Sequence, residues 1–186
     1  MKLKFSFINL DEDKPLIDDW EKQYSETDGF KAITKYVLEN KLYYNLAEVL
    51  SVNFEKVRIG DDEFRNIIVA KTRKNDIAGF ALYNAFSLND KPEVAIIYIA
   101  IHPMMQKKGV GTAMLTEMFE NPQKYFNCTP TKISTLIDIT NNASKKLFRN
   151  FGLKMTARQF SNEELYLFEN TFENILDHMS QQGKTK

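Results

Sequence analysis

The stretch of sequence that most constrains the fold is residues 94–115, because it reads as a buried strand, a turn with glycines and a helix in direct succession. Residues 94–101 are all apolar or aromatic. Such a run is typical of a strand in the middle of a sheet with both faces covered. Pro103 ends the run because proline has no N–H to donate to a neighbouring strand. The apolar residues of the following helix share one face and stop near Pro122; they are Met114, Leu115, Met118 and Phe119.

The turn between this strand and helix has the features of an anion site. Gly109 and Gly111 tolerate positive φ and leave no Cβ in the way of a ligand. The helix that follows directs its positive end and its unpaired N–H groups at the same point. Lys107 and Lys108 add positive charge. We therefore expect the turn to bind a phosphate group.

Two common phosphate loops do not fit the turn. A Rossmann fingerprint needs a third glycine where Met114 stands, and a Walker A loop needs Gly-Lys-Ser/Thr where the chain has Gly111, Thr112 and Ala113. The turn instead resembles the acyl-CoA loop of the GCN5-related N-acetyltransferase (GNAT) superfamily, Gln/Arg-x-x-Gly-x-Gly/Ala. The matching residues are Gln106, Lys107, Lys108, Gly109, Val110 and Gly111. A second segment, residues 141–153, resembles the later GNAT pattern Asn-x-x-Ala-x-x-Phe/Leu-Tyr-x-x-x-Gly-Phe.

The resemblance implies a fold, a cosubstrate and a set of binding residues. The implied fold is a single α/β domain with a mixed central sheet of about seven strands, flanked by helices and containing a splayed pair of parallel strands. The implied cosubstrate is acetyl-CoA. The residues expected to bind it are Ile99, Ala100 and Ile101 on the strand, Gln106, Lys107, Lys108, Gly109, Val110, Gly111 and Thr112 in the turn, and Asn141, Ser144 and Phe148 in the later segment.

The remaining elements follow from periodicity and turn residues. We predict strands at residues 3–10, 64–71, 77–86, 132–139, 153–160 and 164–169. Helices are predicted at about residues 15–28, 30–52 and 142–151 and at 172–179, with a cap at Asn141 or Asn142 and an end at Gly152. The strand at 132–139 returns after a helical crossover, so it should lie parallel to residues 94–101. By resemblance, the coenzyme's pantetheine arm would bind where these two strands splay.

Composition limits the class of protein. We expect one domain over residues 1–186, with residues 180–186 as a frayed tail. Apolar residues make up 43% and charged residues 27%, which is ordinary for a soluble globular protein. The formal net charge of zero argues against a general nucleic-acid binder, and no apolar run is long enough for a membrane span. A single cysteine, Cys128, excludes an internal disulfide and favours the cytoplasm, and two isolated histidines predict no metal site.

Acetyl transfer to an amine needs a proton acceptor, because an attacking amine must be neutral. Many GNAT members carry a glutamate at the position of Ala95. The nearest carboxylate here is Glu93, which we expect to act through water if it acts at all; the alternative is a surface glutamate that follows a turn. The family's usual tyrosine acid matches Phe148, which has no hydroxyl, so water would protonate the leaving thiolate. Phe148 either faces the thioester or packs in the core.

The sequence thus predicts an N-acetyltransferase that moves acetyl from acetyl-CoA to a primary amine by direct attack in a ternary complex. The acceptor would be a small molecule or a peptide amine, and the enzyme a monomer or homodimer without nucleic-acid or membrane partners. One alternative is a CoA-binding regulatory module that has lost catalysis, which the missing glutamate and tyrosine would permit. Another is an α/β protein that binds a different phosphate ligand.

Overall fold

The computed structural model describes residues 2–9, 12–13, 67–159 and 165–183. The helices predicted at 15–28 and 30–52 lie outside the described residues. The chain divides into two compact units, of which the first is Met1–Phe80 with Ala100–Val110 and the second is Ala81–Ile99 with Gly111–Lys186. The strands form one seven-stranded sheet in the order β1-β2-β3-β4-β5-β7-β6. This confirms the predicted mixed sheet.

The first unit contains the N-terminal strand pair. β1 (Lys4–Phe7) lies antiparallel to β2 (Ile67–Lys71), with Phe5 opposite Ala70. An ion pair of 2.5 Å joins Lys71 Nζ to Oδ1 of Asp13, whose side chain is fully buried. The other Asp13 oxygen accepts a hydrogen bond from the Asn9 backbone N–H at 2.8 Å. These contacts tie the start of the chain to the end of β2.

Two tight turns connect the next strands, as the sequence predicts. Asn75, with φ of 68°, lies in the turn between β2 and β3 (Ile77–Leu88), which the Thr72 N–H to Asp76 carbonyl bond closes at 2.9 Å. Asn89 and Asp90 join β3 to β4 (Lys91–Ile101) and have φ of 52° and 60°. Positive φ at both positions is the signature of a type I′ turn, whose twist matches that of the flanking strands.

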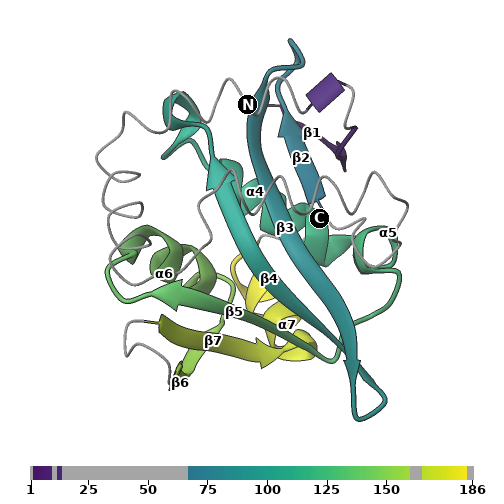
Figure 1. Ribbon diagram of the computed structural model, residues 1–186, viewed down its shortest axis with the longest axis vertical. Helices are drawn as coiled ribbons and strands as arrows, with labels where there is room; N and C mark the ends of the chain where they lie inside the picture. Colours follow the sequence, from purple (N-terminus) through teal and green to yellow (C-terminus); the bar gives the residue numbers. More distant parts are fainter. Residues whose placement is uncertain (1, 10–11, 14–66, 160–164, 184–186) are drawn as a thin grey trace. The chain divides into compact units, whose positions relative to one another are not determined.

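In the second unit, β5 (Lys132–Asp138) follows β4 in the sheet and lies parallel to it. β7 (Leu165–Thr171) pairs antiparallel with β5, and β6 (Lys154–Gln159) pairs antiparallel with β7 at the edge. Figure 1 shows β4, β5 and β7 side by side in this order. The parallel relation of β4 and β5 confirms the crossover prediction.

The helices are α4 (Val110–Glu120), α5 (Pro122–Phe126), α6 (Asn142–Arg149) and α7 (Phe172–Gln181), preceded by a 3-10 turn, η2 (Pro103–Met105). The four apolar residues predicted for the inner face of α4 are at most 1% exposed. Phe119 of α4 makes edge-to-face contacts with Phe151 and with Phe172 of α7, at centroid distances of 5.5 and 6.1 Å. This aromatic cluster is part of the second unit's core.

α4 ends at Glu120, so the predicted stop near Pro122 is confirmed. The predictions missed α5, which begins at Pro122, where proline's missing N–H costs nothing because that N–H would be unpaired anyway. α7 ends at Gln181, two residues beyond the predicted end at residue 179. None of the helices in the described part of the chain has the length and apolar character needed to cross a membrane.

Candidate active site

The parallel strands β4 and β5 pair over only part of their length. The ladder covers residues 93–96 of β4 and residues 132–135 of β5, from Glu93 opposite Lys132 to Ile96 opposite Thr135. Beyond it, β4 continues to Ile101 and β5 to Asp138. The strands therefore splay at their carboxyl ends, where ligands bind in open α/β sheets. This is the wedge that the sequence predicts.

The splay corrects one expectation about β4. The apolar run was predicted to be covered on both faces, yet the side chain of Ile97 is 53% exposed and Tyr98 and Ile99 are only half-buried. Val94 and Ile96, within the paired part, are at most 1% exposed. The apolar run continues past the last paired position, where β5 no longer lies against it.

The turn after β4 has the left-handed backbone expected of it, but at different residues. Lys107 has φ of 59° and Gly109 has φ of 79°. Gly111 is not in the left-handed region, because it is already the second residue of α4. The prediction of positive φ at Gly111 is therefore wrong, and only the absence of a Cβ distinguishes that position.

Hydrogen bonds hold the start of this turn to the first unit. The backbone N–H of His102 donates to the Ala78 carbonyl of β3 at 2.9 Å, and the N–H of Met105 donates to the His102 carbonyl at 2.7 Å. The Gln106 side-chain amide donates to the Ile101 carbonyl at 3.4 Å. These bonds fix the chain where it leaves β4.

The end of the turn presents positive charge and backbone amides. Residues 106–109 are exposed, whereas Val110 is 1% exposed and anchors the first turn of α4. That first turn carries no acidic residue, so nothing in it offsets the positive end of the helix. Thr112 is half-buried one turn into the helix. The loop residues are thus suited to a phosphate group.

The later predicted segment forms α6. Asn141 is its cap, with Oδ1 accepting the Ser144 N–H at 3.0 Å, so the predicted cap is confirmed and this oxygen is engaged by the helix. Phe148 is 3% exposed, which favours the core alternative for its ring. Lys145 Nζ donates to the carbonyl of Ile139 at the end of β5. The helix end is thereby fastened to the strand that borders the wedge.

Glu93 lies at the other end of β4 from the splay. Its side chain is 11% exposed and its carboxylate is 3.0 Å from Lys132 Nζ, which is also 3.4 Å from Glu169. Glu93, and then Glu169, raise the pKa of Lys132. At about 3.3 Å per strand residue, Glu93 is about 20 Å along β4 from Ile99. The structure therefore favours an ion-pairing role for Glu93 over a direct proton acceptor at the wedge.

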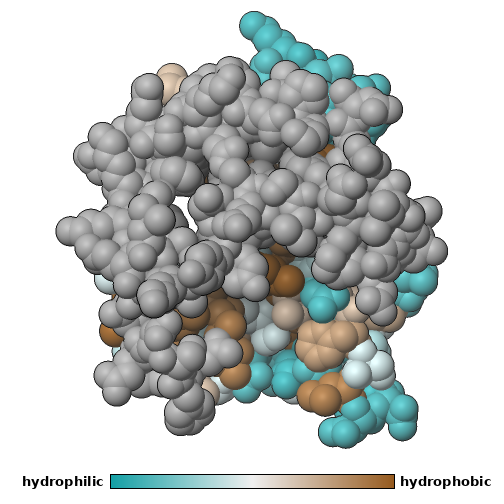
Figure 2. Space-filling model, in the orientation of Figure 1, coloured by the Kyte–Doolittle hydropathy of each residue, from teal (hydrophilic) through white to brown (hydrophobic). Residues whose placement is uncertain are grey.

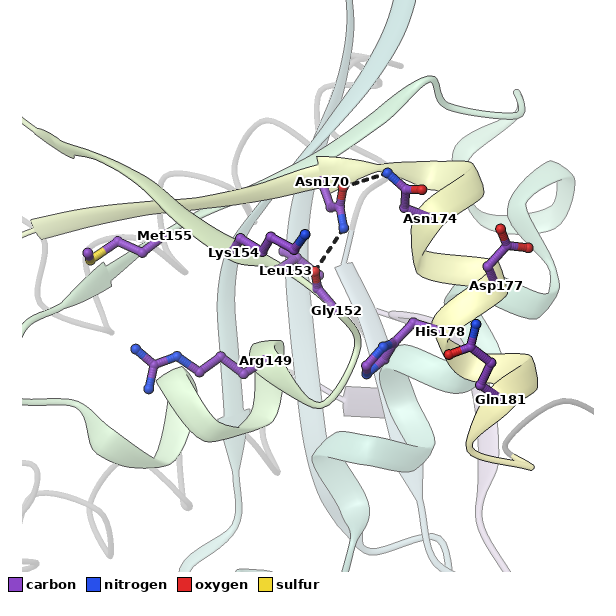
Figure 3. Close-up of a pocket in the computed structure, with 10 residues that line it drawn as sticks. All are labelled: Arg149, Gly152, Leu153, Lys154, Met155, Asn170, Asn174, Asp177, His178 and Gln181. Atoms are coloured by element: carbon purple, nitrogen blue, oxygen red, sulfur yellow. Dashed lines mark hydrogen bonds between the residues drawn. The ribbon is translucent and has the colours of Figure 1, made fainter.

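A separate pocket of about 630 Å³ opens between the end of α6, β6, β7 and α7 (Figure 3). Arg149, Lys154 and His178 are in its wall, and Asn170 bridges the Gly152 carbonyl and the Asn174 amide at 2.8 and 3.1 Å. None of the residues predicted to bind the coenzyme lines this pocket. Gly152, with φ of 81°, packs against the His178 ring, and a Cβ there would come within 3.1 Å of it.

Two further titratable groups are His102 and Cys128. His102 is half-buried, its Nδ1 accepts the Met104 N–H at 3.2 Å, and desolvation lowers its pKa, opposed by nearby Asp76. Cys128 is half-buried, and burial raises its pKa, so it is poorly suited to act as a nucleophile. No group of three or more metal-binding side chains occurs within residues 2–9, 12–13, 67–159 and 165–183.

One feature of the splay was missed by the sequence predictions: Ile97 is a large exposed apolar residue beside it. The signal was available, because counting alternate residues from Glu93 puts position 97 on the same face of β4.

The model of the acetyltransferase (GNAT) family matches residues 17–153. No curated protein matches the sequence significantly. Similar solved structures include the ribosomal-protein-S18-alanine N-acetyltransferase from Escherichia coli (14% identity, 92% of this chain and 94% of that one, TM-score 0.60). Ard1 from Thermoplasma volcanium is similar at 15% identity (92% and 98%, TM-score 0.60).

The spermidine N-acetyltransferase from Vibrio cholerae, solved with CoA and spermine, is similar at 11% identity (94% and 98% of the two chains, TM-score 0.63). At such identities these structures support the fold alone. The family model spans most of the chain, including β4, the turn and α6. The chain therefore belongs to the GNAT family of acetyltransferases.

Proposed function

We propose that the protein is an N-acetyltransferase that uses acetyl-CoA and acetylates a primary amine. The observation that carries the proposal is the end of the β4–β5 ladder at Ile96 and Thr135, followed along β4 by the left-handed turn and the start of α4. A wedge in which β4 and β5 no longer pair with each other suits an amide-bearing arm, and a turn with amides and lysines suits a pyrophosphate. Both features occur in the chain order that an acyl-CoA site requires.

The predicted binding residues divide between these two features. In our proposal the turn residues Gln106, Lys107, Lys108, Gly109, Val110, Gly111 and Thr112 hold the pyrophosphate of acetyl-CoA. Ile99, Ala100 and Ile101 would line the pantetheine arm and offer a backbone N–H to the oxyanion of the tetrahedral intermediate. Asn141 and Ser144 would border the wedge from α6, whereas the buried ring of Phe148 would pack in the core behind them.

In the proposed reaction the amine nitrogen attacks the thioester carbonyl, the carbon–sulfur bond breaks, and CoA leaves as a thiol. The amine loses one proton and the departing sulfur gains one. Because Glu93 is about 20 Å along the strand from Ile99, we propose that water, rather than Glu93 directly, takes the proton from the amine. Phe148 has no hydroxyl, so water would also protonate the sulfur, which is a tolerable leaving group because a thiol pKa is near 8.5.

This chemistry favours an acceptor of modest basicity. At pH 7 an α-amino group with a pKa near 8 is roughly 9% neutral, whereas a lysine-like amine with a pKa near 10.4 is roughly 0.04% neutral. An enzyme without a strong base nearby gains about two hundredfold in reactive amine by using the first. Among the similar structures, one is named for a protein alanine and one for spermidine. Our proposal favours the α-amine class.

The experiment that tests the cosubstrate measures thermal stabilisation by acetyl-CoA, CoA and ATP side by side. We expect stabilisation by acetyl-CoA and CoA but not by ATP, and loss of stabilisation in Gly109→Val and Gly111→Val. Gly183→Val is the matched control, because Gly183 also has positive φ, at 64°, with no atom near its missing Cβ. Stabilisation that survives unchanged in folded Gly109→Val would disprove the assignment of the turn to the coenzyme.

A second candidate function is a CoA-binding regulatory module without catalysis. It is favoured by two residues, Ala95 where the family often has glutamate and Phe148 where it often has tyrosine. An amine panel assayed for CoA release separates the candidates. Stabilisation by acetyl-CoA without CoA release from any amine would support the regulatory module. A cytoplasmic location and a monomeric or homodimeric state stay predictions from the sequence.

A further inference from the structure

An exposed apolar row crosses three strands beside the splay. It consists of Ile97 on β4, Leu136 on β5 and Leu167 on β7, and we call it the apolar row. Ile97 and Leu136 each follow the last paired residues of the parallel ladder, and Leu136 is directly opposite Leu167 in the antiparallel one. Ile97 is 53% exposed and Leu136 is 43% exposed, while Leu167 is half-buried. Leu136 and Leu167 are neighbours across the β5–β7 ladder, and Ile97 comes directly after the last paired residue of β4, where the wedge opens.

The apolar row belongs to the sheet face that points away from the core. Neighbouring residues on the same strands, Ile96 and Ile137, are 1% and 3% exposed, and side chains alternate between the two faces of a strand. In Figure 2, hydrophobic colour gathers on the described part of the viewed face, where Figure 1 shows β5 and β7. Exposed apolar side chains gathered at one place mark a ligand or partner site more often than scattered ones do.

Charge is segregated along the same face. At the opposite ends of the strands the ammonium of Lys132 pairs with the carboxylates of Glu93 and Glu169 at 3.0 and 3.4 Å. Near the wedge, the carboxylate of Asp138 accepts hydrogen bonds from the Thr140 N–H and hydroxyl at 2.6 and 2.5 Å. Within the described part of β4 and β5, no other carboxylate lies on this side of the ladder's end. The apolar row can therefore contact an apolar group of the acceptor, but it offers no carboxylate to an ammonium group that the acceptor carries besides the amine to be acetylated.

We infer that the apolar row selects the acceptor, by holding a large apolar side chain next to the amine that is acetylated. The acceptor class is a peptide whose N-terminal residue is large and apolar, and Ile97, Leu136 and Leu167 are specificity-determining residues. This inference rests on the proposed function, because it assumes that the acetyl group is presented at the wedge. A polyamine, which carries further ammonium groups instead of an apolar chain, is the acceptor that the row disfavours.

The test compares acetylation rates of short peptides that differ only in the first residue, Leu, Asp or Lys, with spermidine as a further acceptor. We expect kcat/KM to be about ten- to a hundredfold higher for the Leu peptide than for the Asp peptide, as expected from burying one apolar side chain. Ile97→Ala and Leu136→Ala should each lower kcat/KM for the Leu peptide severalfold through KM, leaving the KM of acetyl-CoA unchanged. Met155→Ala is the matched control. Met155 is 52% exposed, but it is opposite buried Phe168, so it belongs to the sheet face opposite to that of the apolar row.

The possible results distinguish failure of the acceptor inference from failure of the proposed acetyltransferase function. Transfer to amines with no preference for the Leu peptide, or with unchanged KM in Ile97→Ala and Leu136→Ala, would overturn the inference and leave the acetyltransferase intact. A preference for spermidine would also overturn it. Absence of CoA release with every amine, despite binding of acetyl-CoA, would refute the proposed catalysis and the acceptor inference together.

Discussion

Gly109 and Gly111, which look equivalent in the sequence, have different roles in the backbone. Gly109 has φ of 79°, and nothing lies within 4 Å of where its Cβ would be. Gly109→Ala should therefore cost only backbone strain, about 1–2 kcal/mol. Gly111→Ala should cost nothing or add slightly to stability, because position 111 is helical and alanine is the better helix former.

Thermal unfolding of the two variants checks this prediction. A loss of about 1 kcal/mol should lower the Tm of a chain of this length by about 2–4 °C in Gly109→Ala only. Gly183→Ala, at φ of 64° with open space around it, should lose a comparable amount. Equal Tm values for Gly109→Ala and Gly111→Ala would contradict the assignment of strain to position 109.

Phe148 gives a second prediction at this scale. Its ring is 3% exposed, so a hydroxyl added by Phe148→Tyr would be buried. An unpartnered buried hydroxyl costs about 1–3 kcal/mol, and we expect a lower Tm with no gain in the single-turnover rate of acetyl transfer. A faster and equally stable variant would show instead that the ring faces the thioester and that the hydroxyl can protonate the leaving sulfur.

At the level of single residues, the sequence identifies motifs of consecutive residues better than it predicts burial and contacts with residues far away in the chain. The loop residues 106–112 are consecutive, so a spacing pattern suffices to find them. The burial of Phe148 depends on how α6 packs, and the ion pair of Glu93 depends on Lys132, which comes beside it only through strand pairing. Neither contact has a local signal.

At the scale of whole strands, the charge row at the start of β4, β5 and β7 gives a further prediction. Glu93→Gln should reduce stability by about 2 kcal/mol, because it leaves the Lys132 ammonium with the more distant Glu169 alone. Glu169→Gln should cost less than about 1 kcal/mol, because that pair is more exposed. Urea unfolding of both variants measures the difference.

Glu93→Gln also tests whether Glu93 takes part in catalysis. The acetyl-transfer rate of Glu93→Gln with a high-pKa amine should equal that of the parent protein from pH 6 to 9. A rate below that of the parent protein at the same pH, at temperatures where the variant stays folded, would restore Glu93 as the end of a proton relay.

Within the described residues, the strands and helices with clear periodicity were predicted correctly, and the exceptions have physical causes. α5 was missed because its five residues are too few to show a helical period and begin with a proline. The carboxyl end of β4 was predicted to be covered on both faces because its residues are apolar. Whether these residues are buried depends instead on where the pairing with β5 ends, which the sequence of β4 does not show. The position of β7 between β5 and β6 could not be read from chain order, since those strands are not consecutive neighbours.

At the scale of the whole molecule, stability should fall at alkaline pH. Burial raises the pKa values of Tyr83 and Tyr125, and hydrogen bonds with Tyr125 and Glu93 raise the pKa values of Lys124 and Lys132, respectively. The folded state therefore holds protons that the unfolded chain has released, so the free energy of unfolding decreases as pH rises through and above about 10. At pH values below the pKa that each group has in the unfolded chain, its full contribution to the free energy of unfolding is present. Urea unfolding at pH 8, 9, 10 and 11 should show this decline.

Tyr83→Phe measures the contribution of the Tyr83 hydroxyl to this pH dependence. The Tyr83 hydroxyl donates to the Tyr125 carbonyl, and its ring makes an edge contact of 5.1 Å with Phe126. Without the hydroxyl, the slope of unfolding free energy against pH above 10 should be shallower, whatever the change in absolute stability. An identical slope would show that Tyr83 keeps an ordinary pKa in the folded protein.

The half-buried Cys128 bears on how the proposed reaction can be followed. It is the only cysteine in the sequence, and burial raises the pKa of its thiol, so a smaller fraction is thiolate than in a fully exposed thiol. Thiol-reactive dyes react through the thiolate. Each turnover would release one CoA thiol, so a colorimetric thiol assay would start from a background of at most one slowly reacting group per chain. Continuous assays of many amines could then use the protein as it is, without a cysteine-free variant.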